Sequence, residues 1–153
     1  MKQIRYLTAI LIGCLTLAAP ASAEETQAGL KIQEVFQRYG KKRNVTMVEL
    51  SNEMLETYDM THYKSITIKD DPEALRFVRR CLETDQQGAR KIKEVVDDGG
   101  IVSAYYQLSG SGERNRFILF KLSRRGIVTL VYIEGDLDSE DLITILFAGN
   151  KDL

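Results

Sequence analysis

The chain of 153 residues contains no tryptophan, one histidine, two cysteines and two prolines. With no indole ring and only His62 as an imidazole, few side chains remain for stacking on sugars or for acid–base catalysis. One histidine with two cysteines also cannot supply the four ligands of a structural zinc site. We therefore predict no cofactor and no metal site.

The sequence also lacks an apolar run long enough to span a bilayer. The longest one, residues 6–19, has about 14 residues, whereas a spanning helix needs about 20. Two basic residues precede it and a proline with small residues follows it, which is the pattern of a secretory signal peptide. We expect residues 1–23 to be a signal peptide that is cleaved between Ala23 and Glu24.

A second interpretation of the leader starts from the string Leu11-Ile12-Gly13-Cys14, which resembles a lipobox. Cys14 would then carry the lipid of a surface lipoprotein in the outer membrane. Two features count against lipidation: the apolar run before Cys14 is short, and the residues after it stay apolar instead of turning polar. Cleavage after Ala23 is the favoured prediction, and the mature chain then has no transmembrane helix.

The mature chain, residues 24–153, has the length of a single domain. It keeps 19 of the 21 basic residues, because Lys2 and Arg5 belong to the leader, against 22 acidic ones. This slightly negative balance argues against nucleic acid as a partner. Cys81 is the only cysteine left, so an internal disulfide is excluded and the apolar core must stabilise the fold alone.

Hydrophobic periodicity predicts mainly helices in the first part of the mature chain. Ile32, Val35, Phe36 and Tyr39 recur at helical spacing, which predicts a helix over about residues 27–42. The pattern further predicts a short helix after Ser51, a helix from Asp71-Pro72 to about residue 86, and helical turns over residues 89–96. Strands are predicted over 45–50 and 65–69, and His62 is placed in a loop between them.

The second part of the chain has the pattern of strands. Residues 101–108, 115–123 and 127–134 are β-rich and are joined by short glycine-containing loops, which predicts an antiparallel meander. A helix is expected to begin near residue 138. The predicted fold class is α+β, with helices packed on a largely antiparallel sheet that ends in a three-strand meander and a C-terminal helix.

The strand at 127–134 is apolar on both faces. Such a strand is typical of a central position covered on both sides, or of a sheet with one face used by a partner. On the second interpretation, Ile127, Val131 and Ile133 lie on one face and form a candidate interaction surface.

Cys81 and His62 are the only residues that could form a thiol–imidazole pair. Cys81 lies three residues after Val78 and four after Phe77, near the apolar stripe of a predicted helix, where a free cysteine behaves as a small hydrophobe. We interpret the two residues as a core cysteine and a surface histidine, and predict no catalytic residues.

The acidic run at residues 134–141 superficially resembles a calcium loop, but it lacks the glycine and the final glutamate that such a loop needs. Acidic residues before a helix are expected from capping alone. An alternative is a hydrolase in which an acid of Asp136–Asp141 works with Glu49 or Glu113. Ser109-Gly110-Ser111-Gly112 lacks the pattern of a nucleophile elbow and is interpreted as a hairpin loop.

Three strings resemble small exported proteins of Bacteroides-type bacteria, which belong to domain-of-unknown-function families without an assigned activity. The strings are Tyr39-Gly40-Lys41-Lys42 with Val45–Ser51, Ile101–Leu108, and Tyr132–Leu142. The resemblance covers essentially the whole mature chain, and its motifs are structural, including a Gly-x-Leu after the last strand. It implies a Gram-negative envelope protein in the periplasm or at the outer surface, and it carries over no functional residue.

These observations predict an exported envelope protein that is a non-enzymatic periplasmic binding or interaction module. Its partner would be an envelope protein or a small ligand, and a homo-oligomer is compatible with the sequence. The carboxylate-dependent hydrolase and the lipoprotein anchored through Cys14 stay open as alternatives.

Overall fold

A computed structural model of the chain describes residues 29–109 and 114–148. The predicted leader, with Cys14, Ala23 and Glu24, lies outside these residues. The elements follow one another in this order: α1 (Ile32–Tyr39), β1 (Val45–Glu49), α2 (Asn52–Thr57), β2 (Met60–Ile68), α3 (Pro72–Asp85), β3 (Arg90–Asp97), β4 (Gly100–Leu108), β5 (Asn115–Leu122), β6 (Val128–Gly135) and α4 (Ser139–Ala148).

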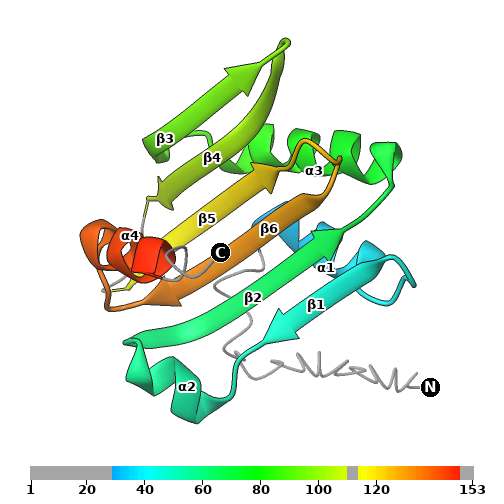
Figure 1. The fold of residues 1–153 in the computed structure, drawn as a ribbon. Coiled ribbons are helices and arrows are strands. Elements are labelled where there is room, and N and C mark those ends of the chain that lie inside the picture. The colour runs from blue at the N-terminus through cyan, green and yellow to red at the C-terminus, as the bar shows by residue number, and fades with distance from the viewer. Residues whose placement is uncertain (1–28, 110–113, 149–153) are drawn as a thin grey trace, which may run out of the picture.

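Six strands in the described part of the chain form one sheet in the order β1-β2-β6-β5-β4-β3, and every neighbouring pair is antiparallel (Figure 1). The strands β4, β5 and β6 are the predicted meander, and α4 follows them as predicted. The α+β class is therefore confirmed. Strand β6 lies inside the sheet between β2 and β5, so the hairpin of β1 and β2 joins the meander through its last strand.

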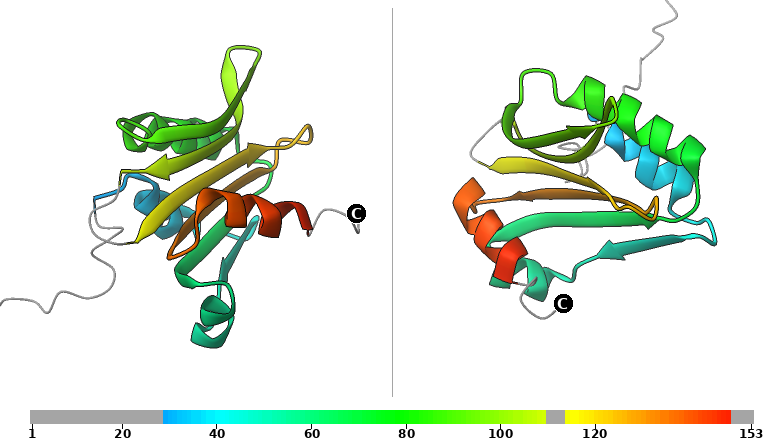
Figure 2. Two further views of the ribbon diagram at one scale, coloured as in Figure 1. Left: turned by 90° about the vertical axis from the view of Figure 1, so that its left-hand side faces the viewer. Right: turned by 45° about the horizontal axis from the view of Figure 1, so that its top comes forward.

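The helices lie on both sides of the sheet (Figure 2). Helices α1 and α3 cover one face, where the larger apolar core includes Ile66, Tyr106 and Leu130. Helix α4 lies on the other face, where a smaller core joins Leu142 to Phe117 and receives Leu55 of α2. We call these the α1/α3 face and the α4 face.

The two helices of the larger core form where the sequence predicts them. All four predicted core residues of α1, namely Ile32, Val35, Phe36 and Tyr39, are buried. Helix α3 begins with Asp71 as its N-cap, whose carboxylate accepts a hydrogen bond from the Ala74 backbone N–H at 2.9 Å, and Pro72 follows at the first helical position.

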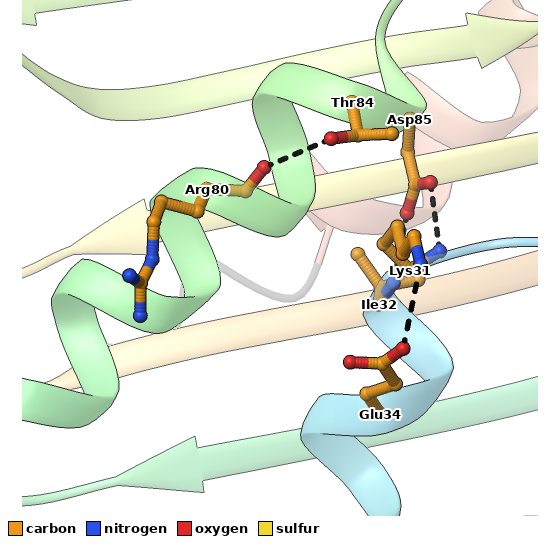
Figure 3. A network of polar contacts seen from close by, with 6 residues as sticks. All are labelled: Lys31, Ile32, Glu34, Arg80, Thr84 and Asp85. Carbon is orange, nitrogen blue, oxygen red and sulfur yellow. Dashed lines mark hydrogen bonds and ion pairs between the residues drawn. The ribbon is translucent and has the colours of Figure 1, made fainter.

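Asp85 connects the C-terminal end of α3 to the N-terminal end of α1 (Figure 3). This residue at the end of α3 is buried, and its carboxylate oxygens accept hydrogen bonds from the backbone N–H groups of Lys31 and Ile32, each at 2.8 Å. These N–H groups belong to the start of α1 and have no partner within that helix. A side chain from α3 therefore caps α1.

The predicted helical turns over residues 89–96 are wrong, because this segment is the edge strand β3. Its apolar residues Ile92 and Val95 are three apart, which imitates helical spacing. The cause is a bulge: Lys91 and Lys93 pair with consecutive residues of β4, so Ile92 is an extra residue in the strand. The turn that joins β3 to β4 contains Asp98 and Gly99, both with positive φ, as hairpin geometry requires.

The predicted loop around His62 is also wrong. Strand β2 begins at Met60, five residues earlier than expected, so His62 is a strand residue paired with Glu134 of β6. Asp59, which has φ of 55°, makes the turn after α2 and lets the strand start at once. Within residues 29–109 and 114–148, no helix has the length and apolarity needed to cross a membrane.

Candidate functional site

The α4 face is only partly covered. Helix α4 packs on the end of the sheet where Phe117 and Ile133 are buried. Beyond α4 the same face continues without a covering helix (Figure 2), and it is hollowed there into a groove of about 530 Å³. We call this the sheet groove. Its lining side chains come from four strands and from α4: Ile92, Lys93, Ser103, Tyr105, Leu119, Lys121, Thr129, Val131 and Ile143.

The floor of the sheet groove is an apolar row across three strands. Tyr105 of β4 pairs with Leu119 of β5, and Leu119 pairs with Val131 of β6. Directly paired positions in a sheet carry their side chains on the same face. Ile143 of α4 contributes an apolar wall beside this row. The groove is thus mainly apolar and has the size of a site for a small molecule.

A polar row runs beside the floor, two residues away from it on each strand. Ser103, Lys121 and Thr129 occupy directly paired positions on β4, β5 and β6. Lys93 of β3 pairs with Tyr105 and lies at the edge of the groove. Both lysines are exposed, and neither takes part in an ion pair within the described residues.

The wall at α4 is held by two sets of hydrogen bonds. The Tyr105 hydroxyl donates to the Ser139 carbonyl at 3.2 Å, and burial raises the pKa of this tyrosine above its usual range. The Asp138 carboxylate accepts hydrogen bonds from the backbone N–H groups of Glu140 and Asp141, at 2.9 and 2.8 Å. Asp138 therefore caps the helix, as the capping interpretation of the acidic run predicts.

The three residues of the candidate interaction surface have different positions. Val131 lines the sheet groove and is half-buried. Ile133 lies further along the same face but is buried in the small core with Leu142. Ile127 precedes β6, is half-buried, and does not line the groove.

A buried carboxylate lies on the α1/α3 face of the sheet. Glu134 of β6 is 1% exposed and accepts a hydrogen bond from the Tyr132 hydroxyl at 3.0 Å. Its oxygens lie 3.5 Å from His62 Nδ1 and 3.9 Å from Arg114 Nη1. Burial first, and the neighbouring charge of Glu134 second, raise the pKa of Tyr132.

His62 also lines a second, more polar cleft of about 420 Å³, together with Gln33, Gln37 and Lys64. The partner of His62 is thus Glu134, whereas Cys81 lies in the large core with α3. Burial, reinforced by the charge of Asp85, raises the pKa of the Cys81 thiol to about 11. Such a thiol is a poor nucleophile, and the interpretation of Cys81 as a core residue is confirmed.

The acids considered for a carboxylate pair are engaged on different elements. Glu49 forms an ion pair with Lys64 at 3.5 Å on β1 and β2, and Asp138 caps α4. Glu113 lies outside the described residues. In the described segments, no group of three or more histidine, cysteine, aspartate or glutamate residues is arranged to hold a metal ion.

The sequence pattern does not reveal most of the groove residues. The signal that could have found them is the alternation in β5, where Phe117, Leu119 and Lys121 share one face. The lysine at the end of an otherwise apolar face marks the polar row. Which residues of β4 and β6 flank it depends on the register, and the register is visible only in the structure.

The chain matches a family model along most of its length. The model is described as a family of unknown function (DUF6108) and matches residues 19–146. The chain therefore belongs to this family, in agreement with the expected resemblance to domains without an assigned activity. No curated protein matches the sequence.

Proposed function

We propose that this DUF6108 protein is an exported, non-enzymatic binding module that holds its ligand in the sheet groove. One observation carries the proposal: an apolar floor on the α4 face of a sheet whose opposite face packs against α1 and α3. Tyr105 of this floor is buried, whereas Leu119 and Val131 are half-buried and keep part of their apolar surface open to the groove. Concave sites with an apolar lining commonly bind ligands.

The composition of the groove supports binding more than catalysis. Its floor is made of Tyr105, Leu119 and Val131. Besides the Tyr105 hydroxyl, which is hydrogen-bonded to α4, its polar groups are two hydroxyls and two ammonium groups. No carboxylate, imidazole or thiol is among the lining side chains of the described residues. A few polar groups around an apolar floor are typical of sites that fix the orientation of a ligand.

The proposed compartment is the envelope of a Gram-negative bacterium, in the periplasm or secreted. It rests on the leader, whose basic start, apolar run and small residues before Glu24 form a secretory signal. Mass spectrometry of the mature N-terminus in a Gram-negative host tests it. A chain that starts at Glu24 is expected. A lipid-modified Cys14 would replace the periplasmic form by a surface lipoprotein.

The groove is tested with a neutral apolar dye, N-phenyl-1-naphthylamine, whose fluorescence rises in apolar surroundings. The mature protein is expected to bind it at one saturable site, and Val131→Glu to abolish binding by placing a charge in the floor. Met54→Glu on α2 is the matched control, because Met54 is exposed and lies outside the groove. Absence of saturable binding, or equal binding by both variants, would overturn the proposal.

A further inference from the structure

The polar row of the sheet groove has the arrangement of a site for an anionic group. Lys121 lies between Ser103 and Thr129, each directly paired with it across a strand boundary. Paired positions hold their Cβ atoms about 5 Å apart, so the side chain of Lys121 has a hydroxyl-bearing neighbour on either side on the groove face. Together they offer a charge-assisted hydrogen bond and two neutral ones to a ligand oxygen.

The charge around the row favours an anion. Among the other lysines of the described residues, Lys31, Lys64 and Lys91 form ion pairs with glutamates, whereas Lys41, Lys42 and Lys69 form none. Lys121 and Lys93 are the ones that line the groove, they have no acidic partner in the described part of the chain, and no acidic side chain lines the groove there. The groove therefore has an uncompensated positive charge of two.

An apolar region continues directly from this charge. The floor of Tyr105, Leu119 and Val131 is the neighbouring row on the same three strands, and Ile143 closes it towards α4. A ligand that fills both rows must have an anionic head and an aliphatic tail. The volume of about 530 Å³ lies in the range of a single small molecule, as for one acyl chain.

Building on the proposed function, we propose that the sheet groove binds a single-chain carboxylate amphiphile, such as a free fatty acid. The carboxylate contacts Lys121, Ser103 and Thr129, and Lys93 adds long-range attraction from β3. The tail lies along the floor towards Ile143. The lysine discriminates by charge and the two hydroxyls by hydrogen bonding, whereas the apolar floor accepts any aliphatic chain, so the head group decides specificity.

The test compares two probes on the mature protein at neutral pH: dodecanoate and its uncharged methyl ester, each below its aggregation limit and each used to displace N-phenyl-1-naphthylamine. Dodecanoate is expected to bind about tenfold more tightly than the ester, the size of one charge-assisted hydrogen bond. Lys121→Gln should weaken dodecanoate by about that factor and leave the ester unchanged. Lys41→Gln, an exposed residue outside the groove, should change neither.

Each outcome separates the two proposals. If dodecanoate and the ester bind equally, or if Lys121→Gln weakens both alike, the head-group assignment is wrong and the groove remains a general apolar site. If neither probe nor the dye binds, the proposed function itself fails. Sedimentation with phosphatidylglycerol vesicles that dodecanoate does not reverse would show a membrane surface as the partner and overturn the assignment to a free carboxylate.

Discussion

The imidazole Nδ1 of His62 lies 3.5 Å from the carboxylate of Glu134. The two residues come from β2 and β6, which are paired only through the tertiary fold, and they are 72 positions apart in the chain. The carboxylate is buried, whereas a quarter of the His62 side chain is exposed. The pair therefore connects the interior of the sheet with the polar cleft beside α1.

Removing the carboxylate is expected to destabilise the sheet. Glu134→Leu should lower the free energy of unfolding by about 2 kcal/mol, because the buried Tyr132 hydroxyl loses its acceptor. Adding Tyr132→Phe should recover part of this loss, since no hydroxyl is then left without its bond. Urea unfolding measures both, with the exposed Glu56→Leu on α2 as the control. An unchanged stability of Glu134→Leu would contradict this role.

The thiol of Cys81 is expected to react slowly. With its pKa raised from 9.0 to about 11, the thiolate fraction at pH 8 falls by about 100-fold relative to the unfolded chain. Alkylation by iodoacetamide in buffer should therefore be at least that much slower than in concentrated urea, where the pKa returns to its ordinary value. A native rate within tenfold of the unfolded rate would show an accessible, activated thiol.

Asp85 gives a prediction for the dependence of stability on pH. Burial raises its pKa above the usual value, against the effect of the two backbone hydrogen bonds. As the pH rises, the Asp85 carboxyl therefore loses its proton at a lower pH in the unfolded chain than in the folded protein. The stabilisation that results from this raised pKa is therefore fully present below pH 3.8. It is lost as the pH rises through the pKa of Asp85 in the folded protein.

Replacing Asp85 tests both its role as the cap of α1 and the direction of its pKa shift. Asp85→Asn should cost about 1 kcal/mol at neutral pH, because an amide cannot accept two backbone hydrogen bonds as a carboxylate does. The gap to the wild type should widen as pH falls through the acidic range, where only the wild type gains stability by protonation. The exposed neighbour Thr84→Ala is the control. A gap that narrows in acid would reverse the assigned direction.

Gly135 is expected to tolerate no side chain. A Cβ atom at this position would collide with the Asp59 carbonyl and lie 2.7 Å from the Met60 Cα, and both are backbone atoms that cannot rotate away. Gly135→Ala should lower the free energy of unfolding by about 2–3 kcal/mol. Gly29→Ala meets no atom within 4 Å and should have little effect on the thermal midpoint. Equal midpoints for the two variants would argue against close packing of β2 on β6.

Calcium is expected to leave the stability unchanged. Asp138, the central acid of the run after β6, already accepts two backbone hydrogen bonds at the start of α4. Its release for a cation would uncap the helix at a cost of about 1 kcal/mol. Thermal unfolding with calcium and with a chelator should therefore give the same midpoint. A higher midpoint in calcium would show that the acidic run binds the ion.

Features that depend on short stretches of sequence could be predicted. The stripe of Ile32, Val35, Phe36 and Tyr39 gave α1, and the Asp71-Pro72 start gave α3, because helical spacing and capping act within one or two turns. The meander was predictable because short loops join its strands. The bulge at Ile92 shows the limit: one extra residue turned the period of a strand into that of a helix.

Features that depend on register could not be predicted. The row of Ser103, Lys121 and Thr129 combines three strands whose relative positions are fixed only when the sheet forms. The same holds for Glu134, which looked like one acid among several in the run but lies buried against His62. A single sequence shows which residues alternate along a strand, and it does not show which of them meet across strands.

The position of β6 in the middle of the sheet has a consequence for the time at which the protein folds. The hairpin of β1 and β2 joins the sheet only through β6, which ends at Gly135. During synthesis, β2 can therefore pair with β6 only when nearly the whole chain has been made, whereas α1 and α3 can meet earlier. If the chain is exported as proposed, late closure of the sheet is an advantage, because a chain passes through a translocation channel before it folds.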